Sequence, residues 1–355
     1  MIRSLCRMSL APLVVALSLL GGDGDDGPYV RWQKGQAQVL RASNGRLETT
    51  QLKPPFKLDL GSLAAAPLRL DPKPPQPADA QFPLPSRILA ISDIHGQKDA
   101  MVAFLQRQGV VDESLKWTFG TGHLVIVGDV LDRGEQATEC LWVLRALEPL
   151  AQANGGRVHL LLGNHEAMVL QGDLRYLHPK YPSLCRDVFH ESMPSLYGPA
   201  TELGRWLRTR PALLRLGNFL FLHGGLDPES FPEKLDLKAV NGAVRKGLDL
   251  GYREAKGNPV FGSRGPLWYR GLLPGIQPEA EASEQAVADL LKRNGLRALI
   301  VGHTTLEQVT AFHGGQVFGV DAGFKEGRPG EGWLWSQGRV WRALSDGTQR
   351  PLTLP

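Results

Sequence analysis

The stretch Ile88-Leu89-Ala90-Ile91-Ser92-Asp93-Ile94-His95-Gly96 decides the fold, because a short apolar run ends there in polar residues that can hold a metal ion. Four later apolar runs end in the same way, with glycine close by. These runs and their endings are 124–127 with Gly128-Asp129, 158–162 with Gly163-Asn164-His165-Glu166, 219–222 with His223-Gly224-Gly225, and 298–301 with Gly302-His303-Thr304. Helix-like segments separate several of the runs, at 97–108, 135–152, 201–207 and 283–294. Buried strands that alternate with helices predict a layered α/β fold.

The composition describes a folded protein and excludes several other classes. Of 355 residues, 42% are hydrophobic and 21% are charged, as expected for one large domain with a sizeable core. A formal net charge of +4 is too small to argue for a nucleic-acid partner. Three cysteines, none at CxxC spacing, exclude a disulfide scaffold and a cysteine-ligated zinc site. The chain has no GxGxxG, GxxxxGK[ST] or GxSxG motif, which disfavours dinucleotide, Walker-type and serine-hydrolase sites.

Residues 1–26 are expected to direct export. Arg3 and Arg7 precede the apolar run 9–20, and small and acidic residues follow it, which is the pattern of a secretory signal peptide. An uncleaved N-terminal anchor is the alternative, and no other apolar run is long enough to suggest membrane embedding. We therefore expect an exported protein, periplasmic or extracellular.

Residues 27–86 are predicted to form a small β element followed by a Pro-rich linker that packs on the main domain. Asn44-Gly45 lies between two strand-like segments and is a strong hairpin signal. Residues 54–85 are rich in Pro and Ala, which favours an extended chain.

The main domain is predicted to span 87–355, with a cap-like insertion near 171–199. The insertion is aromatic and includes Tyr176, Tyr181 and Tyr197. These rings either stack against an aromatic ligand or form the small core that lets the insertion fold, and the sequence leaves both interpretations open.

Six polar residues at the strand ends form the candidate site: Asp93, His95, Asp129, Asn164, His223 and His303. Each one alone has an ordinary explanation as a helix cap, a turn residue or a hydrogen-bonded loop histidine. Their joint occurrence at strand exits favours a site, because such loops are where α/β folds bind ligands. Two carboxylates, one amide and three imidazoles are too many for one four-coordinate ion. They suit two divalent ions that share a bridging carboxylate.

These motifs resemble the calcineurin-like metallophosphoesterases, and within them the phosphoprotein phosphatases. The matching stretches are 93–96, 128–134, 163–166, 223–225 and 302–304, in family order, and Trp268-Tyr269-Arg270-Gly271 falls where the family carries an Arg-Gly pair. The resemblance implies a two-sheet α/β sandwich with helices outside and a dimetal site at strand carboxyl ends. It also divides the ligands between the ions: Asp93 and His95 for the first, Asn164, His223 and His303 for the second, and Asp129 as the bridge.

The resemblance further implies the catalytic roles of four residues. His165 would protonate the leaving oxygen, oriented by Asp132, while Arg133 and Arg270 would grip the phosphoryl oxygens. The chemistry agrees, because an alkoxide or phenoxide needs a proton donor and guanidinium groups pair bidentately with phosphate.

More narrowly, Asp26-Gly27-Pro28-Tyr29-Val30 followed by these motifs is similar to the Shewanella-like branch of the phosphatases, some of which act on phosphotyrosine. Two departures from the eukaryotic pattern put a serine/threonine preference in doubt. Ser92 stands where glycine is usual, and the segment after 320–323 lacks the substrate-loop motif of the serine/threonine enzymes.

We therefore expect a phosphomonoesterase that hydrolyses phosphorylated proteins or peptides by direct attack of a metal-activated water, with a tyrosine preference as one outcome. The cofactors would be two divalent ions, with Mn²⁺ favoured and Fe, Zn or Co also compatible with the ligands. The alternatives are a hydrolase of dinucleoside polyphosphates or other small phosphoesters, and, more remotely, a non-catalytic metal-binding module.

Overall fold

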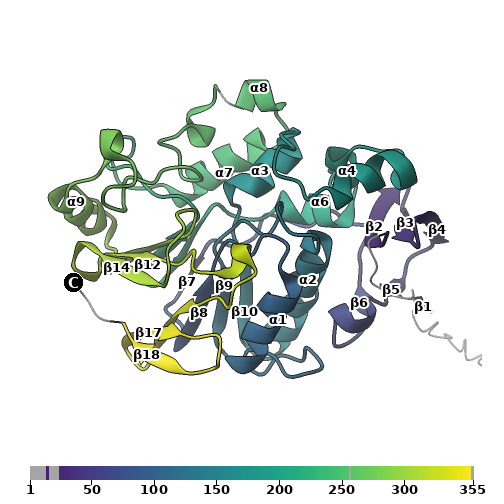
Figure 1. Cartoon of the computed structure of the whole chain (residues 1–355), viewed down its shortest axis with the longest axis horizontal. Helices are drawn as coiled ribbons and strands as arrows, with labels where there is room; N and C mark the ends of the chain where they lie inside the picture. The colour runs from purple at the N-terminus through teal and green to yellow at the C-terminus, as the bar shows by residue number, and fades with distance from the viewer. Residues whose placement is uncertain (1–12, 16–23, 256, 353–355) are drawn as a thin grey trace, which may run out of the picture.

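The computed structural model describes residues 13–15, 24–255 and 257–352. Its centre is a sandwich of two six-stranded mixed sheets, which confirms the predicted fold class (Figure 1). The first sheet has the order β10 (Arg157–Leu160), β9 (His123–Ile126), β8 (Arg87–Ile91), β16 (Gly332–Ser336), β17 (Arg339–Ala343), β18 (Gln349–Pro351). The second has the order β14 (Thr310–Phe312), β15 (Val317–Gly319), β13 (Ala298–Val301), β12 (Phe219–Leu222), β11 (Leu213–Leu216), β7 (Gln81–Phe82).

The apolar runs form strands because both of their faces are buried. In β8, Ile88 and Ala90 belong to the core between the two sheets, whereas Leu89 and Ile91 belong to the core beneath the helices. β8, β9 and β10 are parallel neighbours, as are β12 and β13, so their carboxyl ends meet at one edge of the sandwich. This arrangement brings the five motif loops together.

Aromatic rings fill much of the space between the sheets. Phe219 of β12 packs edge-on against Trp333 and Trp335 of β16, with ring centroids 5.2 and 5.0 Å apart. Edge-to-face packing of this kind stabilises a pair beyond the area that it buries. The two sheets are therefore held together at the opposite side from the motif loops by a rigid apolar core.

The helices cover the outer faces. α1 (Lys98–Arg107) and α2 (Ala137–Ala153) lie over the first sheet, and α7 (Leu237–Gly247) packs on β11 of the second (Figure 1). The remaining helices are α3 (Asn164–Gln171), α4 (Lys180–Leu184), α5 (Met193–Leu196), α6 (Glu202–Leu207), α8 (Tyr252–Ala255) and α9 (Glu284–Asn294). The four helices expected from the sequence occur as α1, α2, α6 and α9, and Thr201 and Ser283 cap α6 and α9 through their side chains.

A three-stranded sheet of β2 (Asp26–Gln33), β3 (Gln36–Ser43) and β4 (Arg46–Leu52) precedes the sandwich, and Asn44-Gly45 forms the predicted hairpin turn between β3 and β4. The sheet packs beside the insertion. The buried ring of Tyr29 meets Phe189 and Tyr197 edge-on, with ring centroids 5.3 and 5.7 Å apart.

Tyr181 and Tyr197 of the insertion are therefore core residues. Both are buried, and their hydroxyl groups bond to residues of α2 or to the loop before it. Tyr176 differs, because 42% of it is exposed and it lies beside the motif loops. The interpretation of the insertion aromatics as a packing core is thus right for Tyr181 and Tyr197.

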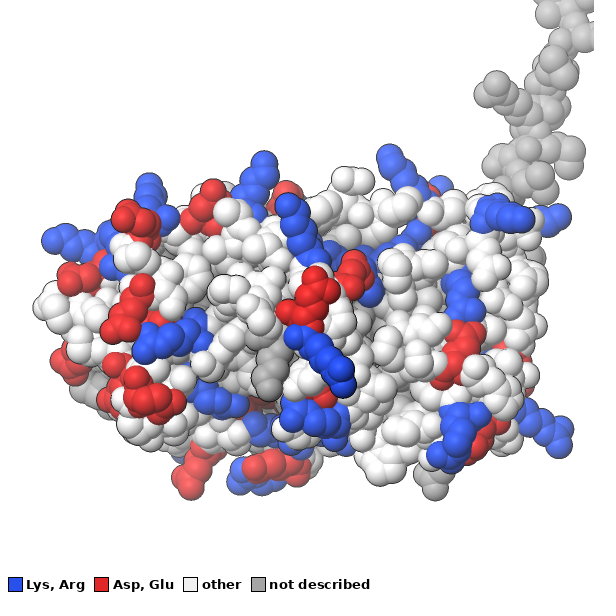
Figure 2. Space-filling view, turned by 90° about the horizontal axis from the view of Figure 1, so that it is seen from above, with Lys and Arg blue, Asp and Glu red and all other residues white. Residues whose placement is uncertain are grey.

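Residues 54–85 contain only short elements: β5 (Phe56–Leu58), η1 (Gly61–Leu63), β6 (Leu68–Arg69) and β7. Most of the expected export signal lies outside the described residues. The exception is β1 (Leu13–Val15), which pairs in parallel with β5. None of the helices within the described residues is both long enough and apolar enough to span a membrane. Figure 2 shows Lys/Arg and Asp/Glu side chains intermixed on the face that carries α3, α7 and α8.

Candidate metal centre

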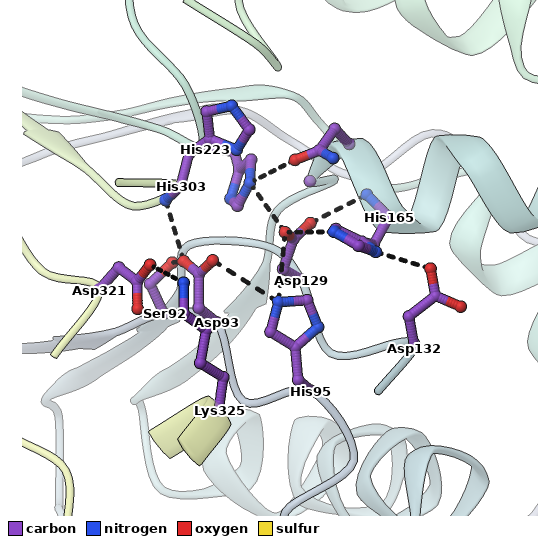
Figure 3. Close-up of polar contacts among 12 residues, drawn as sticks. Ser92, Asp93, His95, Asp129, Asp132, His165, His223, His303, Asp321 and Lys325 are labelled. Atoms are coloured by element: carbon purple, nitrogen blue, oxygen red, sulfur yellow. Dashed lines mark hydrogen bonds and ion pairs between the residues drawn. The ribbon is translucent and has the colours of Figure 1, made fainter. Parts of the chain in front are cut away.

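Five loops bring the six predicted ligands to one place; Figure 3 labels Asp93, His95, Asp129, His223 and His303, and Asn164 contacts His223. The first sheet contributes Asp93 and His95 after β8, Asp129 after β9, and Asn164 at the start of α3 after β10. The second sheet contributes His223 after β12 and His303 after β13. All six side chains are buried, with at most 5% of any of these residues exposed. The site therefore joins the two sheets across the edge of the sandwich.

The backbone at this site adopts an unusual conformation. Positive φ angles between 46° and 69° occur at Asp93, His95, Asp129, Asp132, Arg133 and His303, which are half of the non-glycine residues with positive φ in the described chain. This left-handed region costs free energy for an L-residue and is typical of functional sites. Glycine allows the close approach of the loops, because a Cβ atom on Gly163 would lie 2.0 Å from Oδ1 of Asp129.

Asp129 lies at the centre of the site. Its Oδ2 is 3.7 Å from Nε2 of His95 and 3.1 Å from Nε2 of His223, while its Oδ1 accepts a hydrogen bond of 3.0 Å from the backbone N–H of His165. Ligand atoms within 4.8 Å of one another form two groups that share this carboxylate: His95, Asp129 and His165, and Asp129, His223 and His303. A carboxylate common to two ligand groups is the arrangement that a bridged dimetal site requires.

The first group faces a position rich in lone pairs. Nδ1 of His95 lies 2.8 Å from the carbonyl oxygen of Leu131 and donates to it, so Nε2 keeps its lone pair. That Nε2 faces Oδ1 of Asp93 and Oδ2 of Asp129, both at 3.7 Å. Burial lowers the pKa of His95 to about 3, against the opposing effect of Asp129, so the ring is neutral and able to act as a ligand.

In the second group, as in the first, a histidine Nδ1 donates to a backbone carbonyl and its Nε2 faces oxygen atoms of other ligands. His223 donates from Nδ1 to the carbonyl of Val127 at 2.7 Å, and its Nε2 faces Oδ1 of Asn164 at 2.9 Å and Oδ2 of Asp129 at 3.1 Å. Atoms bound to one ion at ~2.1 Å lie roughly 3.0–3.4 Å apart, which is close to these separations. Nε2 of His303 is buried and has no hydrogen-bond partner among the described residues. The residues present therefore fit two divalent cations.

The electrostatic environment of the site also favours a bound cation. Burial alone would lower the pKa of His223, but the carboxylate of Asp129 outweighs it and raises that pKa to about 9. Burial and the neighbouring His223 lower the pKa of His303. A buried carboxylate that retains a proton on an adjacent imidazole marks a position where a cation is favourable.

His165 and Asp132 form a buried pair next to the ligands. Nδ1 of His165 lies 2.6 Å from Oδ2 of Asp132, and Nε2 lies 3.8 Å from Oδ2 of Asp129. Burial opposes a charge on His165, yet the two carboxylates outweigh it and raise the pKa of the imidazole above its ordinary value. This arrangement can hold a proton at the edge of the metal position.

Two residues that the sequence did not place among the ligands hold the loops in position. Glu166 is fully buried and accepts hydrogen bonds of 2.8–3.0 Å from the backbone N–H groups of residues 129, 130, 131 and 163, so it braces the loop. Ser92 donates from Oγ to Oδ2 of Asp93 at 2.6 Å. This bond leaves Oδ1 of Asp93 to face His95, and no sequence signal pointed to that role.

A cavity of about 290 Å³ opens above the ligands and is lined by three cationic side chains. Arg133 and Arg270 were expected there, and Lys325 was not. Arg270 donates to the carbonyl of His303 and to Oγ1 of Thr304, whereas Arg133 makes no ion pair with any described residue. Lys325, on the short helix η6 (Phe324–Glu326), lies 2.7 Å from Oδ2 of the buried Asp321.

Comparisons with known proteins agree with this geometry. The sequence pattern of the calcineurin-like phosphoesterases matches residues 86–306. The crystal structure of the cold-active protein-tyrosine phosphatase of a psychrophilic Shewanella species superposes with a TM-score of 0.85, at 33% identity over 93% of this chain and 99% of that one. An uncharacterized protein of Schizosaccharomyces pombe is 32% identical over 71% of this chain and 77% of its own length. Shewanella-like protein phosphatase 2 of Arabidopsis thaliana is 27% identical over 63% of this chain and 67% of its own length.

The matched segment covers more than half of the chain and contains all six candidate ligands together with His165 and Asp132. The chain belongs to the calcineurin-like phosphoesterase family.

Proposed function

We propose that this protein is a dimetal-dependent phosphatase of phosphorylated proteins or peptides, with a preference for phosphotyrosine. The observation that carries the proposal is the position of Asp129, whose one carboxylate faces both ligand groups beside the His165–Asp132 pair. The similarity to a tyrosine phosphatase and to a Shewanella-like protein phosphatase supports the substrate class. Because both named relatives are protein phosphatases, hydrolysis of dinucleoside polyphosphates is the weaker alternative.

The ligands are assigned to two ions. Asp93 and His95 would hold the first, Asn164, His223 and His303 the second, and Asp129 both. When bound, the ions would supply a water of lowered pKa and neutralise phosphoryl charge. Manganese is our preferred metal, and the nitrogen and oxygen donors also accept iron, zinc or cobalt.

The remaining residues act on the substrate. Arg133 and Arg270 line the cavity and would pair with the phosphoryl oxygens. His165 would give its proton to the oxygen that leaves phosphorus, so that the product departs as a neutral alcohol or phenol. The short bond to Asp132 keeps the imidazole oriented and favours its protonated form before that transfer.

Tyr176 supports the aromatic preference. Its ring centroid lies 5.2 Å from that of His165 and 5.1 Å from Cζ of Arg133, so it lines the cavity between the proton donor and a phosphate-binding group. A phosphotyrosine ring whose oxygen faces His165 would lie against this side chain, and aromatic pairs add stability beyond buried area. Phosphoserine has no ring to place there.

The decisive experiment measures initial rates of phosphate release from one peptide phosphorylated in turn at Tyr, Ser or Thr, with Mn²⁺ and with a chelator. We expect chelator-sensitive hydrolysis that is fastest on phosphotyrosine. Uniformly poor rates on all three peptides, with good rates on nucleotides, would contradict the proposal.

We also propose that the protein is exported, on the basis of the sequence pattern of residues 1–26. Cell fractionation of the source organism followed by determination of the mature N-terminus tests this. Full-length protein in the cytoplasm would contradict it.

A further inference from the structure

Alternating tyrosine and arginine side chains lead away from the cavity across the surface. Cζ of Arg133 lies 5.1 Å from the ring centroid of Tyr176, and Cζ of Arg175 lies 5.5 Å from the same ring. Arg175 also lies 5.8 Å from the ring centroid of Tyr252 on α8. We refer to Arg133, Tyr176, Arg175 and Tyr252 as the Arg–Tyr stack. It begins at the catalytic cavity, where Arg133 and Tyr176 line the wall.

The Arg–Tyr stack is held in place by other contacts. Arg175 binds the buried Asp173 through two hydrogen bonds of 2.8 Å each, which fixes the plane of its guanidinium group. The backbone N–H of Arg133 donates to the carbonyl of Tyr176 at 2.8 Å, which ties the insertion to the catalytic loop. A binding surface that is already ordered loses less conformational entropy when a ligand binds.

The stack is also exposed to solvent. Tyr176 and Tyr252 are 42% and 38% exposed, and they are two of the five large hydrophobic side chains with such exposure among the described residues. The charge of Arg175 is matched by Asp173, and both signs of charge are intermixed on this face (Figure 2). The outer part of the stack, Arg175 and Tyr252, therefore offers flat aromatic and guanidinium faces without a local excess of positive charge, whereas the charge of Arg133, unpaired among the described residues, lies at the cavity.

We propose that the Arg–Tyr stack binds the segment of the substrate chain next to the phosphorylated residue and favours an apolar or aromatic side chain there. This inference rests on the proposed phosphatase function. Its support is the continuity of the stack with the cavity, since a phosphotyrosine bound at Tyr176 must continue as peptide across the neighbouring surface. Cζ of Arg175 lies 5.5 Å from the ring centroid of Tyr176 and 5.8 Å from that of Tyr252. The sum of these distances is shorter than four residues of extended chain at ~3.3 Å per residue, so a short peptide can reach from Tyr176 to Tyr252.

The test uses the full-length protein and three substrates. Two are phosphotyrosine peptides of equal length and charge, one with leucine and phenylalanine in the three positions on each side and one with glycine there. The third is p-nitrophenyl phosphate, which has no chain to reach Tyr252. We expect the wild type to prefer the apolar peptide by roughly 5–10-fold in kcat/KM, in line with about 1 kcal/mol for one aromatic contact.

Tyr252→Ala should reduce the preference for the apolar peptide to less than twofold. The ratio of kcat/KM on the apolar peptide to kcat/KM on p-nitrophenyl phosphate should fall in the same proportion. Tyr252→Phe, which keeps the ring, should retain the preference. Leu84→Ala removes a side chain of similar exposure that lies outside the stack and the cavity, and it serves as the matched control. Equal wild-type rates on the two peptides, or a preference that survives Tyr252→Ala, would overturn the inference while leaving the phosphatase proposal intact. Hydrolysis of p-nitrophenyl phosphate with neither peptide cleaved would overturn both.

Discussion

Nδ1 of His165 lies 2.6 Å from Oδ2 of Asp132, and neither residue is more than 4% exposed. This contact occupies Nδ1 of the imidazole, so Nε2 is the nitrogen that remains available to the cavity. It also separates His165 from the metal ligands proper, whose Nδ1 atoms donate to backbone carbonyls in His95 and His223.

The first prediction concerns proton donation. His165→Ala should retain bound metal and lower kcat by ~10²–10⁴ on an alkyl phosphate. The loss should be much smaller on an aryl phosphate whose leaving group needs no proton. Steady-state rates on the two substrates, with metal content by elemental analysis, measure this. His190→Ala, an exposed histidine outside the cavity, is the control, and equal losses on both substrates would refute the acid role.

The second prediction concerns the bridge. Asp129→Asn keeps the shape of the side chain and its tolerance for positive φ, but removes one negative charge from both ligand groups. We expect the protein to lose affinity for both ions together, with activity falling in parallel as metal is titrated out. Isothermal titration with Mn²⁺ and elemental analysis give the stoichiometry. Two ions retained at full activity would show that Asp129 does not bridge.

The third prediction concerns Lys325, which lines the cavity and which the sequence analysis had not marked. Because Lys325→Met alone would leave the carboxylate of Asp321 buried without its partner, the informative variant is Lys325→Met with Asp321→Asn. If the ammonium group binds the phosphoryl group, this variant should bind inorganic phosphate about tenfold more weakly, with metal content unchanged. An unchanged inhibition constant for phosphate would assign the pair a purely structural role.

The fourth prediction concerns the pH dependence of stability. Burial, with a further contribution from Asp26, raises the pKa of Glu139 to about 7, against the nearby ammonium groups of Lys180 and Lys98. The folded state then holds a proton that the unfolded state has lost between about pH 4.5 and pH 7, so stability falls as the pH rises through that window.

The side chain that Glu139→Gln introduces cannot titrate. The free energy of unfolding of this variant, relative to the wild type, should therefore rise by on the order of 1–3 kcal/mol when the pH is raised from 4.5 to 8. Urea unfolding at both pH values measures the difference. The exposed Glu113→Gln serves as the control. A constant difference between Glu139→Gln and the wild type at both pH values would contradict the linkage.

One sequence pattern predicted both the five central strands and the assembly of the ligands, while the two-sheet arrangement was implied by the family resemblance. A strand buried on two faces is apolar throughout, and its end is marked by glycine and a polar residue. β16 and β17 were not predicted, since neither strand ends in the glycine and metal-capable residues that mark the other strands. Lys325 could not be found from the sequence, because a lysine four residues after an aspartate is an ordinary surface pattern. The tyrosines of the insertion look alike in the sequence, and only their tertiary contacts distinguish the buried ones: Tyr197 packs on Tyr29, and Tyr181 bonds to α2.

The left-handed backbone at Asp93, His95, Asp129, Asp132, Arg133 and His303 has a consequence for the tolerance of this chain to random mutation. Apart from proline, whose ring forbids it, valine, isoleucine and threonine are the residues least able to adopt that conformation. In a saturation library, β-branched variants at these six positions should vanish from the soluble fraction, while asparagine and glycine variants accumulate there without turnover. Ranking the variants at these six positions by soluble yield would then give a different order from ranking them by catalytic activity. Soluble yield would follow the backbone conformation that each residue allows, and activity would follow the chemistry of its side chain.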